Sequence, residues 1–379
     1  AQLPSYIQTG GDATHGTLTM GGSGQWRVHS TTVTLSITGG NFTAGNFTIL
    51  ANGNNDVANI TIGGNAIVTL PAFPTTRSFG GTAYLTFDGG TLRPTASSSA
   101  YLGGLTSATI RSGGVTFDTN SYNITVSQAL LANATSTGGG LTKNGTGTLT
   151  LSGANTYTGT TAINGGTLQI GAGSTTGSLS SSSSITNNGT LSFNRTDTLT
   201  QGTDFGTTIS GTGNLIQAGT GTTILSGANT YAGSTTISAG TLQMAHASAL
   251  GSSGNITFSG GALQYGSGIT TDISSRIKNS GSAIVIDTNS NNVTFSSNLG
   301  STNSGGLTKN GSGTLILGTD NTYSGTTTVN AGTLQLTGNI SSSALTIGNG
   351  GIVSIGTTAA VAKYNASSIT LRGGSGLAI

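Results

Sequence analysis

Apolar and polar residues alternate in short runs along this chain, and apolar residues do not recur at the three-to-four-residue spacing of a helix. Leu149 and Leu151 flank Thr150, and the same alternation returns at 168–170, 315–317 and 334–336. Side chains of a strand point alternately to opposite faces, so these runs predict short, half-buried β-strands. An all-β fold follows from this pattern.

Clusters of glycine and asparagine separate the alternating runs, for example at 152–155, 164–166 and 330–332. Both residue types tolerate the positive φ that a tight corner needs. The order strand, corner, strand, corner, without a helical stretch, predicts a parallel β-solenoid. Gly-Gly-Thr-Leu at 89–92 and Gly-Gly-Ala-Leu at 260–263 repeat the corner, so we expect one continuous solenoid over 16–379 after a leader at 1–15.

Three segments of the chain repeat one pattern: 140–170, 214–244 and 306–336, which start 74 and then 92 residues apart. Such self-similarity is typical of a fold in which each unit buries its apolar edge against the next. At about 20 residues per coil the chain would make about 18 coils. Two residue types recur at each repeated corner and are expected to be structural: Tyr157, Tyr231 and Tyr323, with Asn155, Asn229 and Asn321.

The run Leu-Thr-Lys-Asn-Gly-Thr-Gly-Thr-Leu-Thr-Leu-Ser-Gly-Ala-Asn-Thr-Tyr-Thr-Gly-Thr-Thr at 141–161 resembles the autotransporter-associated β-strand repeat, also called the passenger-associated transport repeat. The resemblance implies a single-stranded, right-handed parallel β-helix in the form of an elongated rod. It also implies a place outside a bacterium, in a secreted passenger of the kind found in adhesins and surface fibres.

Composition narrows the possible partners. The chain has no cysteine, which excludes disulfides and thiolate metal sites. Its four lysines and seven arginines are scattered, the net charge is +2, and no basic stripe for nucleic acid is present. No apolar run approaches the length of a membrane helix. A glycine-rich chain can also be disordered, but 33% of the residues are hydrophobic and follow strand spacing, which favours folding.

Candidate catalytic residues are sparse. The chain has no glutamate and nine aspartates, of which Asp197 and Asp204 are the closest pair. Glycoside hydrolysis usually needs two facing carboxylates, so a carbohydrate-active enzyme is a minor alternative. Asp12, His15 and His29 share an N-terminal stretch, but their spacing matches no ligand motif. We therefore expect no catalytic, metal or cofactor-binding residue and no cofactor.

Two surface functions remain as alternatives. The repeated tyrosines could form an aromatic stripe for glycans, although we expect each ring to cover its own corner with a solvated hydroxyl. The recurrent Thr-x-Thr, as at 146–150, could bind ice, but ice matching needs one motif per coil in constant register. The recurrent threonines also have a structural explanation, because a β-branched side chain suits an exposed strand position.

The two ends of a solenoid expose unpaired strand edges, and neither end of this chain carries an evident cap. We expect head-to-tail stacking of copies through five apolar residues: Leu3, Tyr6, Ile7, Leu377 and Ile379. The first residue, Ala1, fits a chain whose export signal has been removed, and a cloned fragment would look the same. The sequence thus predicts a non-catalytic, extracellular structural protein, self-assembling or adhesin-like.

Overall fold

The computed structural model describes residues 5–15, 18–20, 32–45, 47–50, 56–73, 75–76, 81–340, 344–355 and 368–378. The chain divides into two compact units. Unit 1 comprises residues 1–192 and 202–208, and unit 2 comprises residues 193–201 and 209–379. Strand β20 (Thr190–Arg195) contains the first of the three boundaries.

Unit 1 is built from strands that are mostly three to six residues long. Its strands are β1 (Ser5–Gln8), β2 (Asp12–His15), β3 (Leu18–Met20), β4 (Thr32–Ile37), β5 (Asn41–Ala44), β6 (Phe47–Leu50), β7 (Val57–Leu70), β8 (Thr75–Thr76), β9 (Thr82–Pro94), β10 (Ser98–Leu102), β11 (Ser107–Ile110), β12 (Val115–Asp118), β13 (Ile124–Val126), β14 (Leu130–Ala132), β15 (Leu141–Asn144), β16 (Thr148–Leu151), β17 (Thr161–Ile163), β18 (Thr167–Ser174) and β19 (Ile185–Asn187).

Unit 2 has the same kind of strand and one short 3₁₀ helix, η1 (Ser274–Arg276). Its strands are β21 (Thr198–Thr200), β22 (Ile209–Ser210), β23 (Asn214–Gln217), β24 (Thr222–Leu225), β25 (Thr235–Ile237), β26 (Thr241–Met244), β27 (Ile256–Phe258), β28 (Ala262–Tyr265), β29 (Ile284–Asp287), β30 (Val293–Phe295), β31 (Leu307–Asn310), β32 (Thr314–Leu317), β33 (Thr327–Val329), β34 (Gly332–Leu336), β35 (Leu345–Ile347), β36 (Gly351–Ile355), β37 (Ile369–Leu371) and β38 (Gly376–Ala378).

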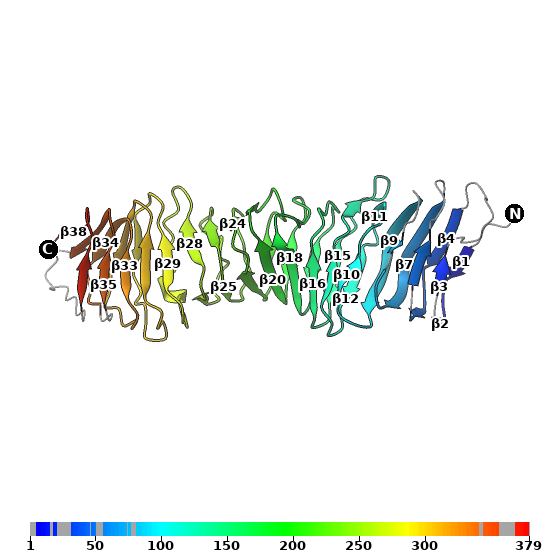
Figure 1. Ribbon diagram of the computed structural model, residues 1–379, viewed down its shortest axis with the longest axis horizontal. Coiled ribbons are helices and arrows are strands. Elements are labelled where there is room, and N and C mark those ends of the chain that lie inside the picture. The colour runs from blue at the N-terminus through cyan, green and yellow to red at the C-terminus, as the bar shows by residue number, and fades with distance from the viewer. Residues whose placement is uncertain are drawn as a thin grey trace. The chain divides into compact units, whose positions relative to one another are not determined.

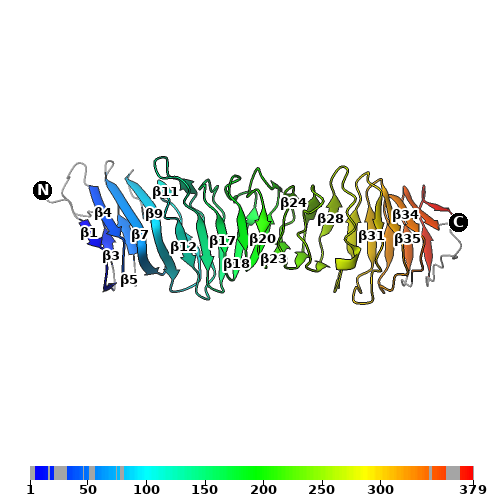
Figure 2. The same cartoon turned by 180° about the vertical axis from the view of Figure 1, so that it is seen from behind.

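Within each unit the strands form parallel ladders. In unit 1 one ladder runs β1-β4-β7-β9-β12-β15-β17-β19 and another runs β10-β13-β16-β18. In unit 2 the long ladder is β21-β24-β26-β28-β29-β31-β33-β35-β37, beside β30-β32-β34-β36-β38. Figures 1 and 2 show the strands of successive coils side by side in each unit. Each unit is thus a parallel β-solenoid, which confirms the predicted fold class.

Coil length differs between the repeats and the rest of the chain. Within each repeat, paired residues are 19 or 20 apart, as in Thr148↔Thr167 and Lys143↔Ile163. Among the other described pairs the offset ranges from 18, at Thr327↔Leu345, to 29, at Ser5↔Thr34. A regular coil of about 20 residues therefore describes the repeats and not the rest of the chain, and the expected number of coils was too high. Irregular spacing also argues against a surface matched to ice.

The core consists of columns of inward-facing side chains, one from each coil. In unit 1, Leu35, Ile60, Leu85, Ala108 and Leu130 occupy successive paired positions and are all buried. Every coil adds apolar surface to the same column, and burial stabilises a fold by about 25 cal/mol per Å². This stacking is why short alternating runs suffice to build the fold.

A column can also contain a charged side chain. Lys143 lies between Phe117 and Ile163 in unit 1, and Lys309 lies between Ile286 and Val329 in unit 2. Both lysines are fully buried. Our sequence interpretation did not predict this placement, because Lys-Asn-Gly before a turn is typical of a solvated corner.

The ends of the described chain differ from the expectation of a leader at 1–15. Strands β1 and β2 pair in parallel with β4 and β5, so these residues belong to a coil. Leu3 and Ile379 lie outside the described residues. Tyr6 and Ile7 lie in β1, and Leu377 lies in β38. Within the described residues, no helix is long and apolar enough to span a membrane.

Candidate functional site

The three repeated tyrosines are buried inside their corners. Tyr157, Tyr231 and Tyr323 have no exposed surface, and each hydroxyl lies 2.7 Å from the Oγ1 of the threonine four residues later. Burial raises the pKa of Tyr231 to about 12, and the hydrogen bond between Tyr231 and Thr235 opposes this effect. The expectation of solvated hydroxyls was wrong. Rings at these positions cannot form a surface stripe for glycans.

The repeated asparagines lie outside the named strands and bridge neighbouring coils. Asn155 Oδ1 accepts the main-chain N–H of Leu130, 2.9 Å away in the preceding coil. Its Nδ2 donates to the main-chain oxygen of Ser178, 2.7 Å away in the following coil, and to that of Gly153. The side-chain amide thus supplies the hydrogen bonds that a strand would otherwise make.

The other two asparagines repeat this arrangement. Asn229 Oδ1 accepts from Ile209 N at 2.9 Å, and its Nδ2 donates to Ala249 O at 2.8 Å. Asn321 Oδ1 accepts from Leu299 N at 2.8 Å. All three side chains are buried. None of them has a positive φ, which among described non-glycine residues occurs at Asn120, Asn279 and Asn289. Their role is therefore the side-chain bridge, not the turn conformation that asparagine suggested.

Lys143 and Lys309 each fill a cradle of main-chain oxygens at the first corner of repeats 1 and 3 (140–170 and 306–336). Lys143 Nζ donates to the oxygens of Asn144, Gly145 and Gly165 at 2.8, 2.8 and 3.1 Å. Lys309 Nζ makes the equivalent bonds at 2.8, 2.7 and 3.1 Å. Burial lowers the pKa of both lysines to about 8, while Asp118 and Asp287 act in the opposite direction.

Repeat 2 (214–244) places Gln217 at the position of these lysines. Gln217 Nε2 donates to the main-chain oxygens of Gly219 and Gly221, at 2.9 and 3.2 Å. Gln217 is 1% exposed, and its Oε1 has no hydrogen-bond partner in the described chain. A buried acceptor without a donor is costly, so this corner is the least satisfied of the three.

The coils before repeats 1 and 3 also match each other. Asp118-Thr119-Asn120-Ser121 and Asp287-Thr288-Asn289-Ser290 share one tetrapeptide, and each aspartate Oδ1 accepts the N–H of the asparagine two residues later. Arg93 donates to Asp118 Oδ2 in unit 1, and Gln264 donates to Asp287 Oδ2 in unit 2. The two identical tetrapeptides could have indicated these matching turns from the sequence, but our sequence interpretation did not use them.

The other candidate carboxylates are engaged in structural hydrogen bonds. Asp272 accepts from the main-chain N–H and the hydroxyl of both Ser274 and Ser296. Burial would raise the pKa of Asp272, but these hydrogen bonds outweigh burial and lower it. Hydrogen bonds from Arg195 lower the pKa of Asp197. Asp197 and Asp204 fall in different units. A carboxylate that already accepts several donors is poorly prepared to act as a base.

The chain has three histidines, and the described residues contain no cluster of side chains that could bind a metal ion. His246 Nδ1 accepts the N–H of Ser248 at the surface. Asp12 is exposed, the side chain of His15 is not described, and His29 lies outside the described residues. Across the described ranges, no group of three or more potential ligands could hold a metal ion.

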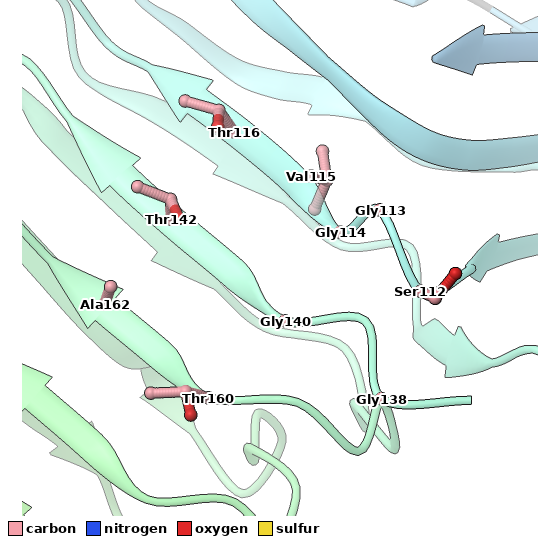
Figure 3. Close-up of a pocket in the computed structure, with 10 residues that line it drawn as sticks. All are labelled: Ser112, Gly113, Gly114, Val115, Thr116, Gly138, Gly140, Thr142, Thr160 and Ala162. Atoms are coloured by element: carbon pink, nitrogen blue, oxygen red, sulfur yellow. The ribbon is translucent and has the colours of Figure 1, made fainter. Parts of the chain in front are cut away.

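A shallow groove of about 320 Å³ lies on unit 1 where three coils turn into strands β12, β15 and β17 (Figure 3). Glycines line its base, and hydroxyls of Thr142 and Thr160 lie along it. A salt bridge between Arg111 and Asp88 lies nearby, since Gly113 N donates to Asp88 Oδ1. The groove offers hydrogen bonds to a neutral polar ligand. No charged side chain is among the residues that line it.

Comparison with known proteins supports the resemblance seen in the sequence. The passenger-associated-transport-repeat model matches residues 141–170, 215–244 and 307–336. A segment of 131 residues is 34% identical to the "Adhesin BmaC autotransporter" of Brucella suis biovar 1 (strain 1330). That segment is 34% of this chain and 4% of the relative, so the chain corresponds to a small part of that protein. No solved structure matches. This chain therefore carries three passenger-associated transport repeats. The buried tyrosine, the bridging asparagine and the filled corner are parts of their internal structure.

Proposed function

We propose that this chain is a non-catalytic segment of an extracellular, adhesin-like passenger, in which the repeats act as a scaffold. The observation that carries the proposal is the burial of the repeated side chains. Tyr157, Asn155 and Lys143 are all buried. Asn155 and Lys143 hydrogen-bond to neighbouring coils, and Tyr157 hydrogen-bonds to a threonine of its own coil. Residues that recur for packing leave ligand contacts to the outer faces and loops.

Surface location can be tested by displaying the full chain, fused to a translocating domain, on a Gram-negative host. Antibody against the chain should label intact cells, and added protease should remove the label. Labelling that requires permeabilised cells would contradict an extracellular role. Adhesion is then measured as retention of these cells on host-cell layers, relative to cells that display the translocating domain alone.

Self-association is a second candidate, favoured by the last described coil. Ile369 and Leu371 pair with the buried Leu345 and Ile347 and continue their columns, yet they are 51% and 56% exposed. Leu377 is 38% exposed. A parallel coil from a second copy would bury these side chains, which supports head-to-tail stacking.

Light scattering and electron microscopy of the purified chain test this second candidate. Ile369→Lys with Leu371→Lys should abolish association, because charges would face the incoming coil. Thr370→Lys, on the same strand, is the matched control and should assemble like the unaltered chain. Monodisperse monomers of the unaltered chain at high concentration would contradict self-association.

Glycan binding is kept as an alternative because of the groove at Thr142 and Thr160. A neutral glycan could use its hydroxyl and main-chain groups. Binding on a glycan array that is lost in Thr142→Tyr, which would fill the groove, supports this alternative. An array without signal would remove it.

A further inference from the structure

Tyr84 of strand β9 is exposed, unlike most tyrosines that the structure describes. Its exposed fraction is 39%. Five tyrosines have no exposed surface: Tyr101, Tyr157, Tyr231, Tyr265 and Tyr323. The other large hydrophobic side chains that are exposed in the described chain all lie in β36, β37 or β38. Packing of the core therefore does not account for Tyr84.

Strand β9 holds Tyr84 in a fixed position. Tyr84 pairs with Asn59 of β7 on one side and with Ser107 of β11 on the other. Figures 1 and 2 show β7, β9 and β11 in this order along unit 1. Ala83 and Leu85, the neighbours of Tyr84 in β9, are buried in the core. A side chain on an interior strand is placed more precisely than one on a loop, so the ring needs little ordering before it meets a ligand.

Neutral polar side chains surround Tyr84 on the outer face of the sheet. They are Thr82 and Thr86 in β9, Asn59 and Thr61 in β7, and Ser107 and Thr109 in β11. All of these residues are half-buried, and Thr86 Oγ1 lies 3.5 Å from Thr109 Oγ1. Neighbours on one face lie about 4.8 Å apart across a sheet and about 6.6 Å apart along a strand. The ring therefore has a hydroxyl or amide group on each of its four sides.

The absence of charge around Tyr84 selects the class of ligand. None of these side chains is charged, and the nearest charged residue of β9, Asp88, faces Arg111 at 4.0 Å. Nucleic acid needs a basic surface, and a stable protein interface needs a much larger area than one ring provides. A neutral sugar has an apolar face that stacks on an aromatic ring and hydroxyl groups at its rim that bond to polar side chains. The surface around Tyr84 fits that chemistry.

We propose that the outer face of β7, β9 and β11 binds a neutral polysaccharide, with one sugar ring stacked on Tyr84. Asn59, Thr86 and Ser107 hydrogen-bond to the rim of that sugar and to the sugars beside it. The repetition of polar side chains from coil to coil lets the polysaccharide lie along the ladder. This function goes beyond the scaffold role of the repeats, and the surface is separate from the groove on β12, β15 and β17.

Affinity electrophoresis of the purified chain in gels that contain galactomannan, xyloglucan or dextran tests the proposal. At least one of these soluble, neutral polysaccharides should retard the chain. Tyr84→Ala should weaken that binding about tenfold, because stacking on the ring is lost, and Tyr84→Phe should keep most of it. Thr142→Tyr fills the groove and should bind like the unaltered chain. No retardation by any of the three polysaccharides, or equal retardation of Tyr84→Ala, would overturn the proposal.

A measurement on the unaltered chain guards against a variant that fails to fold. Tetranitromethane nitrates accessible tyrosines, and peptide mass spectrometry locates the product. A polysaccharide bound to the proposed face should protect Tyr84 from nitration and leave the rate unchanged at Tyr122, which is half-buried elsewhere in unit 1. Equal nitration of Tyr84 with and without the polysaccharide rejects the site. Both tests use the purified chain, so their outcome is independent of the surface display that tests the extracellular role.

Discussion

Repeats 1 and 2 share their framework and differ in one corner. Both have a buried tyrosine bonded to a threonine and a buried asparagine that bridges coils. At the first corner, repeat 1 has Lys143, Asn144 and Asn164, where repeat 2 has Gln217, Ala218 and Ser238. Asn164 Nδ2 donates a hydrogen bond to Asn144 Oδ1 at 3.0 Å. Ala218 in repeat 2 has no side-chain acceptor and cannot form this bond.

The difference separates geometric from electrostatic requirements. Features that set the path of the chain are the same in both repeats, because a coil must bridge to its neighbours at fixed distances. Two positions at the corner differ together. Repeat 1 has a charged pair, lysine with aspartate, and repeat 2 has a neutral pair, glutamine with asparagine (Asn194). Repeat 3 keeps the charged version, with Lys309 and Asp287. The fold therefore needs donors for the corner carbonyls, and the charge itself can be replaced.

Removing the lysine should give the largest effect and would sharpen this contrast. Lys143→Met removes three hydrogen bonds to main-chain oxygens, of which Asn144 O keeps Thr119 as a donor, and should lower the free energy of unfolding by about 3 kcal/mol. Gln217→Met removes two neutral hydrogen bonds and one unpaired acceptor, and should cost about 1 kcal/mol. Denaturant unfolding measures both. Lys143→Gln should recover part of the loss, and equal costs in the two repeats would contradict the comparison.

Removing the bridging asparagine should affect both repeats alike. Asn155→Ala and Asn229→Ala each leave a buried N–H and a buried carbonyl oxygen unpaired, at a cost of about 2 kcal/mol. Because Asn229 also exchanges two hydrogen bonds with Gln201, Asn229→Ala is compared with its parent in a Gln201→Met background. Denaturant unfolding measures the loss, and hydrogen exchange should show faster opening of Leu130 N or Ile209 N. Thr156→Ala, exposed beside Asn155, is the control and should change little. A large difference between repeats would show that the bridge is not a shared requirement.

Removing the tyrosine hydroxyl should cost less. Tyr157→Phe leaves the ring in place and removes one hydrogen bond to Thr161, for about 1 kcal/mol. A double-mutant cycle with Thr161→Val isolates the pair, and the same cycle at Tyr231 and Thr235 should give a similar coupling. Coupling near zero in both repeats would mean that the ring alone is needed.

A dependence of stability on pH is also expected. The pKa of Lys143 and of Lys309 is about 8 in the folded chain, against an ordinary value of 10.5. Between these values the unfolded chain binds more protons, so the free energy of unfolding should rise with pH from about 8 to 10.5. The contribution is complete above 10.5 and is lost as pH falls through 8. Lys143→Gln with Lys309→Gln should flatten this rise, and an identical pH profile for the variant would contradict it.

The strands and their repeats could be predicted because both depend on local order. Alternation at 148–151 and 167–170 indicated strands β16 and β18, and glycine at 166 marked a corner with positive φ. The functions of Asn155 and Lys143 could not be predicted, because their partners lie about 20 to 25 residues away in other coils. A turn-like sequence does not show which polar side chain turns inward.

The sequence by itself determined that this chain is a parallel β-solenoid with three related repeats, because side-chain alternation and glycine corners are properties of neighbouring residues. Only the tertiary structure decided which polar groups are buried. Stacking brings the carbonyl oxygens of successive coils to one point, and a lysine or a glutamine at that point then becomes an interior residue. The physical reason is that a buried main-chain oxygen must find a donor, wherever the chain supplies one.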